Sequence, residues 1–146
     1  MILNAVLALL AAAPLSQAHH GFVIEFDPKL PVVLKGKVTK VELINPHSWI
    51  HMKVEEPGKP AQEWMVEGGT PNTLLRAGVT KDTLKVGTEI VARGFQSRDR
   101  SCKPKCKANG RDLTLPDGKK IFIKSREEAA KGAGAYDEEP AEPKKK

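Results

Sequence analysis

Two pairs of histidines are the residues of this chain best suited to carry chemistry. His19 and His20 are adjacent near the start of the chain, and His47 and His51 lie four residues apart. Cleavage after Ala18 would give His19 a free α-amine beside its imidazole ring. Amine and imidazole nitrogens suit copper or nickel, and the affinity order of divalent metals favours Cu(II). These four histidines therefore form a candidate copper site.

Two alternatives to this copper site stay open on the sequence. Cleavage after Gln17 would place a histidine third in the mature chain, an arrangement that binds Cu(II) through backbone amides. In the metal-free alternative, the first two histidines only keep a cleavage site polar, and His47 only caps a turn after Pro46.

The cleavage site is inferred from an apolar leader. Residues 2–10 are almost wholly apolar, and Ser16-Gln17-Ala18 places small residues at the two positions that a signal peptidase reads, although no Lys or Arg precedes the apolar run. We expect residues 1–18 to be a signal peptide and the protein to be periplasmic or secreted. No later segment is long and apolar enough to cross a membrane, so we expect no transmembrane segment in the mature chain.

The second histidine pair lies on a predicted strand over residues 48–55. Side chains alternate along a strand, so His47, Trp49 and His51 share one face. The opposite face carries the apolar side chains of this strand, which we expect to line the core: Ile50, Met52 and Val54. The two imidazoles and the indole should therefore point outward. We expect an extended N-terminal segment, residues 19–31, to cover them, which would bring His19 or His20 close to the pair.

The rest of the chain reads as mainly β. Strands are predicted over residues 32–43, 48–55, 62–67, 88–95, 112–115 and 119–123, with a short helix that Thr70 caps and Gly78 ends. Gly36 and a shift of apolar parity near residues 38–41 indicate a coiled, bulged first strand. Three strands, a helix and further strands are the order of an OB-like barrel of five to six strands, with one short helix between strands three and four. Another small barrel or a sandwich is the alternative.

This barrel is expected to occupy residues 32–124. Residues 125–146 are rich in Ala, Gly, Glu, Pro and Lys, and such a composition does not bury enough apolar surface to offset chain entropy. We therefore expect a disordered charged tail after the barrel.

A basic loop follows the fourth predicted strand. Cys102 and Cys106 are the only cysteines, and in an oxidising compartment we expect them to form a disulfide. The loop supplies four candidate ligand-binding cations, with Trp49 as a stacking surface: Arg98, Arg100, Lys103 and Lys105. The net charge of +6 would suit anionic partners, but the lysines are spread along the chain, which favours a role of this charge in solubility. A glycan, a lipid head group or an envelope protein fits export, and nucleic acid does not. The alternative is a solvated charged loop with no ligand.

Several short strings give the chain a family resemblance. They are Ala18-His19-His20-Gly21-Phe22, Glu25-Phe26-Asp27-Pro28, Gly36-Lys37-Val38, Asn45-Pro46-His47-Ser48-Trp49-Ile50, Glu67-Gly68-Gly69-Thr70-Pro71-Asn72, Asn109-Gly110-Arg111-Asp112 and Leu115-Pro116-Asp117-Gly118. In their order, over roughly residues 19–124, they resemble an uncharacterised family of short secreted bacterial proteins, a domain of unknown function. The resemblance implies a secreted OB-like domain and no established activity.

These observations favour a small binding or accessory module. Cu(II) bound through the N-terminal histidines is the sharper hypothesis, and a metal-free domain that binds a ligand or partner is the alternative. The sequence shows no common catalytic constellation. A copper-dependent oxidative enzyme, whose N-terminal histidine brace the candidate site resembles, is therefore the least favoured function.

Overall fold

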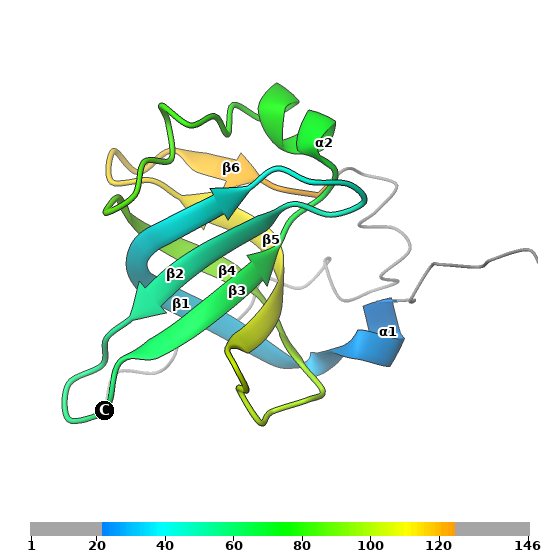
Figure 1. Cartoon of the computed structure of the whole chain (residues 1–146), viewed down its shortest axis with the longest axis vertical. Helices are drawn as coiled ribbons and strands as arrows, with labels where there is room; N and C mark the ends of the chain where they lie inside the picture. The colour runs from blue at the N-terminus through cyan, green and yellow to red at the C-terminus, as the bar shows by residue number, and fades with distance from the viewer. Residues whose placement is uncertain (1–21, 125–146) are drawn as a thin grey trace, which may run out of the picture.

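The computed structural model describes residues 22–124, which form six strands and two short helices (Figure 1). In chain order the elements are α1 (Phe22–Glu25), β1 (Phe26–Glu42), β2 (Trp49–Val54), β3 (Gln62–Glu67), α2 (Pro71–Arg76), β4 (Glu89–Ser97), β5 (Cys106–Thr114) and β6 (Lys120–Phe122). The predicted mainly β fold, with one short helix between the third and fourth strands, is confirmed. The predicted signal peptide, His19, His20 and the charged tail lie outside the described residues.

The six strands form one sheet in the order β3-β2-β1-β4-β5-β6, in which neighbouring strands are antiparallel. An additional parallel pairing joins β3 to β5, so that five of the strands form a ring and β6 extends from it. This pairing places Trp64 opposite Cys106 and Glu67 opposite Asn109. It therefore closes the ring between β3, at one end of the sheet, and β5, the last strand but one, and it brings segments far apart in sequence side by side.

β1 is the strand that makes the ring possible. Its first part pairs with β4 and its last part with β2, and Gly36 takes part in both pairings. A Cβ at Gly36 would lie 2.2 Å from the carbonyl oxygen of Lys53, so only glycine fits this close crossing. The register shifts between Val38 and Lys40, which confirms the predicted bulge. β1 begins at Phe26, earlier than predicted, because Phe26 still pairs with Ser97 of β4.

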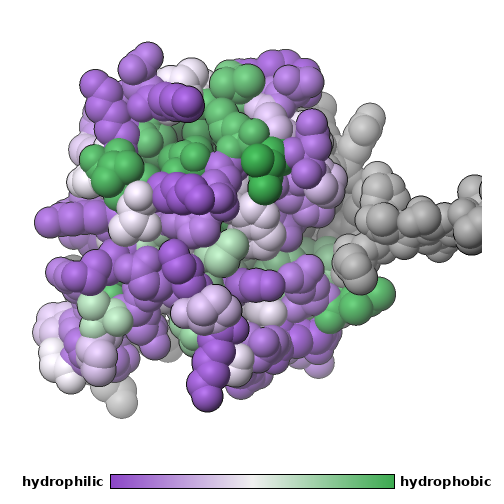
Figure 2. Space-filling model, viewed as in Figure 1, coloured by the Kyte–Doolittle hydropathy of each residue, from purple (hydrophilic) through white to green (hydrophobic). Residues whose placement is uncertain are grey.

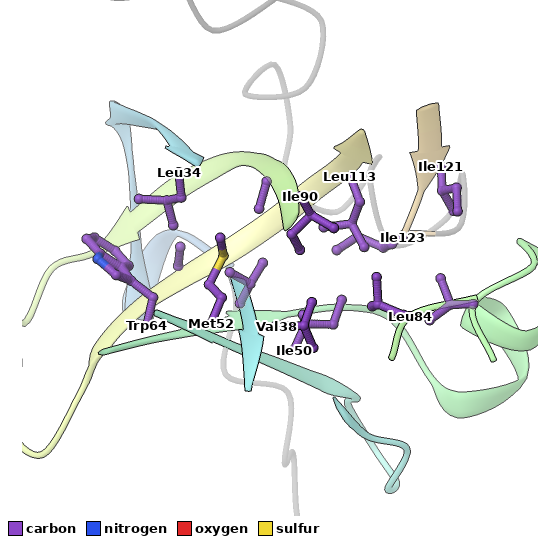
Figure 3. Close-up of a cluster of buried hydrophobic side chains, with 14 of the residues drawn as sticks. Leu34, Val38, Ile50, Met52, Trp64, Leu84, Ile90, Leu113, Ile121 and Ile123 are labelled. Atoms are coloured by element: carbon purple, nitrogen blue, oxygen red, sulfur yellow. The ribbon is translucent and has the colours of Figure 1, made fainter. Parts of the chain in front are cut away.

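The core fills the ring from one end to the other. Figure 3 shows the indole of Trp64 near one end and Leu84 and Ile123 near the other. α2 lies at this second end, where Leu74 is fully buried. Thr70 caps the helix as predicted, because its hydroxyl accepts a hydrogen bond of 3.2 Å from the backbone N–H of Thr73.

Neither helix resembles a membrane span. Within residues 22–124, no helix combines the length and the apolar character needed to cross a bilayer.

Candidate functional site

The histidine strand has the two faces that its alternation predicts. Ile50, Met52 and Val54 are buried in the core. His51 therefore lies on the outer face, yet only 6% of its surface is exposed. Trp49, on the same face, is half-buried. The predicted outward direction of His51 is right, but the described side chains that contact it are Glu42 and Lys105 and not the N-terminal segment.

Each ring nitrogen of His51 has a charged side chain as its neighbour. Its Nε2 lies 2.7 Å from a carboxylate oxygen of Glu42, and its Nδ1 lies 3.4 Å from Nζ of Lys105. An ammonium group only donates, so Nδ1 accepts from Lys105 and Nε2–H donates to Glu42. The hydrogen bond from Lys40, and then that from His51, lower the pKa of the Glu42 carboxyl. Neither nitrogen of His51 is left for a metal.

His47 has a different environment, centred on a buried carboxylate. Its Nδ1 lies 3.3 Å from Oε1 of Glu67, while the imidazole remains 44% exposed. Oε1 of Glu67 also accepts hydrogen bonds from Nδ2 of Asn109 at 3.1 Å and from Nζ of Lys124 at 2.9 Å. Nε2 of His47 has no hydrogen-bond partner among the described residues. The acid thus holds the ring so that Nε2 is the nitrogen left for a ligand.

The Glu67 cluster was not predicted from the sequence. Glu67 and Asn109 meet only because β3 and β5 pair in parallel, and Lys124 comes from the segment after β6. The one available signal was that Glu67, Asn109 and His47 each belong to a quoted family motif. In the structure, residues from these three motifs meet at the buried Glu67 carboxylate, which Lys124 also contacts.

The two histidine clusters are separate, and this limits the candidate copper site. Among residues 22–124, no group of three or more His, Cys, Asp and Glu side chains lies close enough together to hold a metal ion. A metal site would need ligands from outside residues 22–124, where the candidate ligands His19 and His20 lie.

The described part of the N-terminal segment, from Phe22 onward, does not pack as expected. The predicted extended segment is helical over residues 22–25. The ring of Phe22 meets that of Phe95 edge to face at 5.8 Å, and it stacks on Phe26 at 6.0 Å. The described part of the N-terminal segment therefore packs on β4, and the expectation that Phe22 and Phe26 cover the histidine strand is wrong. Aromatic contact with Phe95 is the physical reason.

The basic loop between β4 and β5 is anchored at several points. Cys102 and Cys106 form the predicted disulfide. Ser101 donates its backbone N–H to the Asp99 carboxylate at 2.9 Å, which lowers the pKa of that carboxyl. Lys105 lies 3.5 Å from Glu63 as well as beside His51. The loop is thus tied to itself and to the outer face of β2 and β3.

The four predicted ligand-binding cations of this loop fall into two groups. Arg98 lies 3.8 Å from Asp27, and Lys105 pairs with Glu63, so acids offset both charges. Arg100 and Lys103 are exposed, and neither has an ion-pair or hydrogen-bond partner among residues 22–124. Arg100 and Lys103 are therefore two cations without an acidic partner on an anchored loop.

Trp49, predicted as a stacking surface for a ligand, is linked to the loop only indirectly. Lys105 contacts His51, which follows Trp49 by two residues on the same face of β2. The structure thus joins Lys105 to the histidine strand.

Comparison with known families assigns the chain to one of them. Residues 7–105 match the model of a family described only as a family of unknown function, DUF6152. The chain belongs to this family. The match runs through α2 and β4 to Lys105, while the motifs at residues 109–112 and 115–118 lie beyond it. Searches of curated proteins and of solved structures found no significant match to the DUF6152 chain.

Proposed function

We propose that this DUF6152 protein is a periplasmic or secreted binding module that recognises an acidic glycan without a metal. Its ring of strands would then be a small OB-like barrel. In such folds the loop between the fourth and fifth strands is one of those that bind oligosaccharides and oligonucleotides. The β4–β5 loop has this position here, and it carries the basic residues.

The observation that carries the proposal is the pair of uncompensated cations, Arg100 and Lys103. A disulfide and the contacts of Lys105 anchor the loop that presents them, so little conformational entropy is lost when a ligand binds. A guanidinium group pairs with a carboxylate through two parallel hydrogen bonds, which suits the uronic acids of acidic glycans.

The surroundings of the loop favour a sugar over a lipid or a nucleic acid. Residues 98–105 contain no large aliphatic or aromatic side chain that would insert into a bilayer. Trp49 lies opposite Glu67 at the α2 end of β2, so the proposed site consists of the loop and does not include this indole. Export, which the leader predicts, places the protein among glycans and away from nucleic acid.

Isothermal titration calorimetry with an oligogalacturonate tests the proposal, with a neutral oligosaccharide as the ligand control. Lys103→Glu and Arg100→Glu should each weaken binding about tenfold, because each reverses a charge that pairs with a ligand carboxylate. Lys81→Glu is the matched control, since Lys81 is an equally exposed cation outside this loop. An equal loss with Lys81→Glu, or an oligogalacturonate that does not bind, would refute the proposal.

Cu(II) binding at the N-terminus is the second candidate function. The observation that favours it is the contact between His47 and the buried Glu67, because metal-binding histidines usually give their other ring nitrogen to a carboxylate or carbonyl. In this proposal Nε2 of His47 joins the α-amine and the imidazole of His19. Copper would be bound by nitrogen ligands alone, and His51 would take no part.

A further inference from the structure

One end of the molecule carries an apolar surface that the glycan proposal does not use. Figure 2 shows apolar residues gathered between α2, the α2–β4 connection and the last part of β1. Three of the five exposed large hydrophobic side chains of the described residues belong to segments at this end: Ile44 at 53%, Leu75 at 47% and Val86 at 73% exposure. We call these three side chains, with the surface between them, the apolar face.

The fold holds this face in place. Gly87 donates its backbone N–H to the carbonyl of Val38 at 2.7 Å, which fixes Val86 beside β1. Ser48 donates its backbone N–H to the carbonyl of Gly69 at 2.8 Å, which fixes the end of the β1–β2 loop beside the start of α2. Beneath the face, the core includes buried side chains of α2 and of the connection after it: Leu74, Val79 and Leu84. The exposed side chains are therefore presented by an ordered support.

Basic residues accompany the apolar side chains. Arg76 follows Leu75 directly, Lys85 precedes Val86 directly, and Lys81 lies between them in the chain. All three are exposed, and none has an ion-pair partner among the described residues. Asp82 is the single acid in residues 71–88. The face therefore combines aliphatic side chains with a positive rim.

From this combination we propose that the apolar face docks on an anionic lipid surface. Aliphatic side chains at the tips of an ordered surface insert among the acyl chains, and lysines and arginines around them attract anionic head groups. A symmetric contact between two copies of the chain would instead bring Arg76, Lys81 and Lys85 of one copy close to those of the other, and like charges oppose such pairing. The positive rim thus favours a membrane over a second copy.

This membrane site is independent of the proposed glycan site. Figure 1 shows α2 at the top of the molecule and the loop between β4 and β5 at the bottom. The two sites can be disabled separately, because the cations of the loop and those of the rim belong to different segments.

Vesicle co-sedimentation of the full chain tests the proposal. The protein should bind vesicles that contain phosphatidylglycerol and should not bind vesicles of phosphatidylcholine alone. Val86→Asp should reduce the association constant about tenfold, because it places a charge at the inserted tip. Lys85→Glu should reduce it at least about fivefold through the loss of head-group attraction. Both positions are exposed, so neither change disturbs the core, and circular dichroism checks that the variants fold.

Matched control variants show whether vesicle binding depends on the apolar face. Ile24→Asp introduces the same charge at a side chain that is 67% exposed in α1, away from the apolar face, and it should leave vesicle binding unchanged. Lys103→Glu should also leave it unchanged. Vesicle binding that Ile24→Asp weakens as much as Val86→Asp would overturn the proposal, as would no binding to either vesicle. A dimer in analytical ultracentrifugation that Val86→Asp abolishes would assign the face to a second copy instead.

Discussion

His47 lies just before β2 and His51 lies within it, and their different neighbours give these two histidines different chemistry. His51 has one nitrogen on Glu42 and the other on Lys105. His47 has one nitrogen on Glu67 and keeps the other for a ligand. The difference arises from residues distant in sequence. Because both of its nitrogens have partners, His51 is a structural residue and not a candidate metal ligand.

The copper proposal therefore makes a residue-specific prediction. In the exported chain, with its N-terminus established by intact mass, His47→Gln should change the Cu(II) electron paramagnetic resonance spectrum and weaken binding, whereas His51→Gln should change neither. Binding should also weaken below neutral pH, because the α-amine, with a reference pKa of about 7.7–8.0, must lose its proton to bind metal. A spectrum that depends on His51, or a chain that ignores Cu(II), would exclude this site.

The sequence could predict directions at the residue scale, but it could not predict environments. Strand alternation placed Ile50 and Met52 in the core and His51 opposite them, because side chains along a strand have a fixed period of two residues. It could not show that Glu42 and Lys105 bury His51, since β1 and the β4–β5 loop meet β2 only through the sheet pairing.

At the scale of elements, Gly36 allows β1 to pair with both β4 and β2. β1 passes from β4 to β2 at this residue, where the backbone of Lys53 leaves no space for a side chain. Gly36→Ala should therefore lower the free energy of unfolding by about 2–3 kcal/mol, the cost typical of atoms forced into a packed region.

Urea denaturation followed by circular dichroism measures this loss. Lys37→Ala is the matched control, because Lys37 is the next residue of β1 and its side chain is exposed. It should change the free energy of unfolding by less than about 0.5 kcal/mol. A Gly36→Ala variant as stable as this control would show that β1 does not need the close crossing.

Local elements were predictable here, and the long-range pairing was not. The cap at Thr70, the bulge after Val38 and the exact span of β3 follow from signals within a few residues. β5 begins at Cys106, well before the predicted strand at Asp112, because its first part pairs in parallel with β3. That stretch is held by a distant partner and shows little apolar alternation of its own, so it reads as loop.

At the scale of the whole molecule, two surfaces of different character lie at opposite ends of the ring. The β4–β5 loop presents cations without aliphatic side chains, and the apolar face presents aliphatic side chains with a cationic rim. The first suits a soluble polyanion and the second suits a lipid surface. Under the two proposals, the protein would hold an acidic glycan while bound to a membrane, within a family whose function is not established.

Recognition of an acidic glycan by the β4–β5 loop is the central claim, and a nuclear magnetic resonance titration of the labelled chain with an oligogalacturonate tests it most directly. We predict the largest chemical-shift changes in residues 98–105. The amides of residues 71–88, at the opposite end of the molecule, should stay unchanged. Shifts confined to residues outside the loop, or no shifts at ligand concentrations in the millimolar range, would contradict the account.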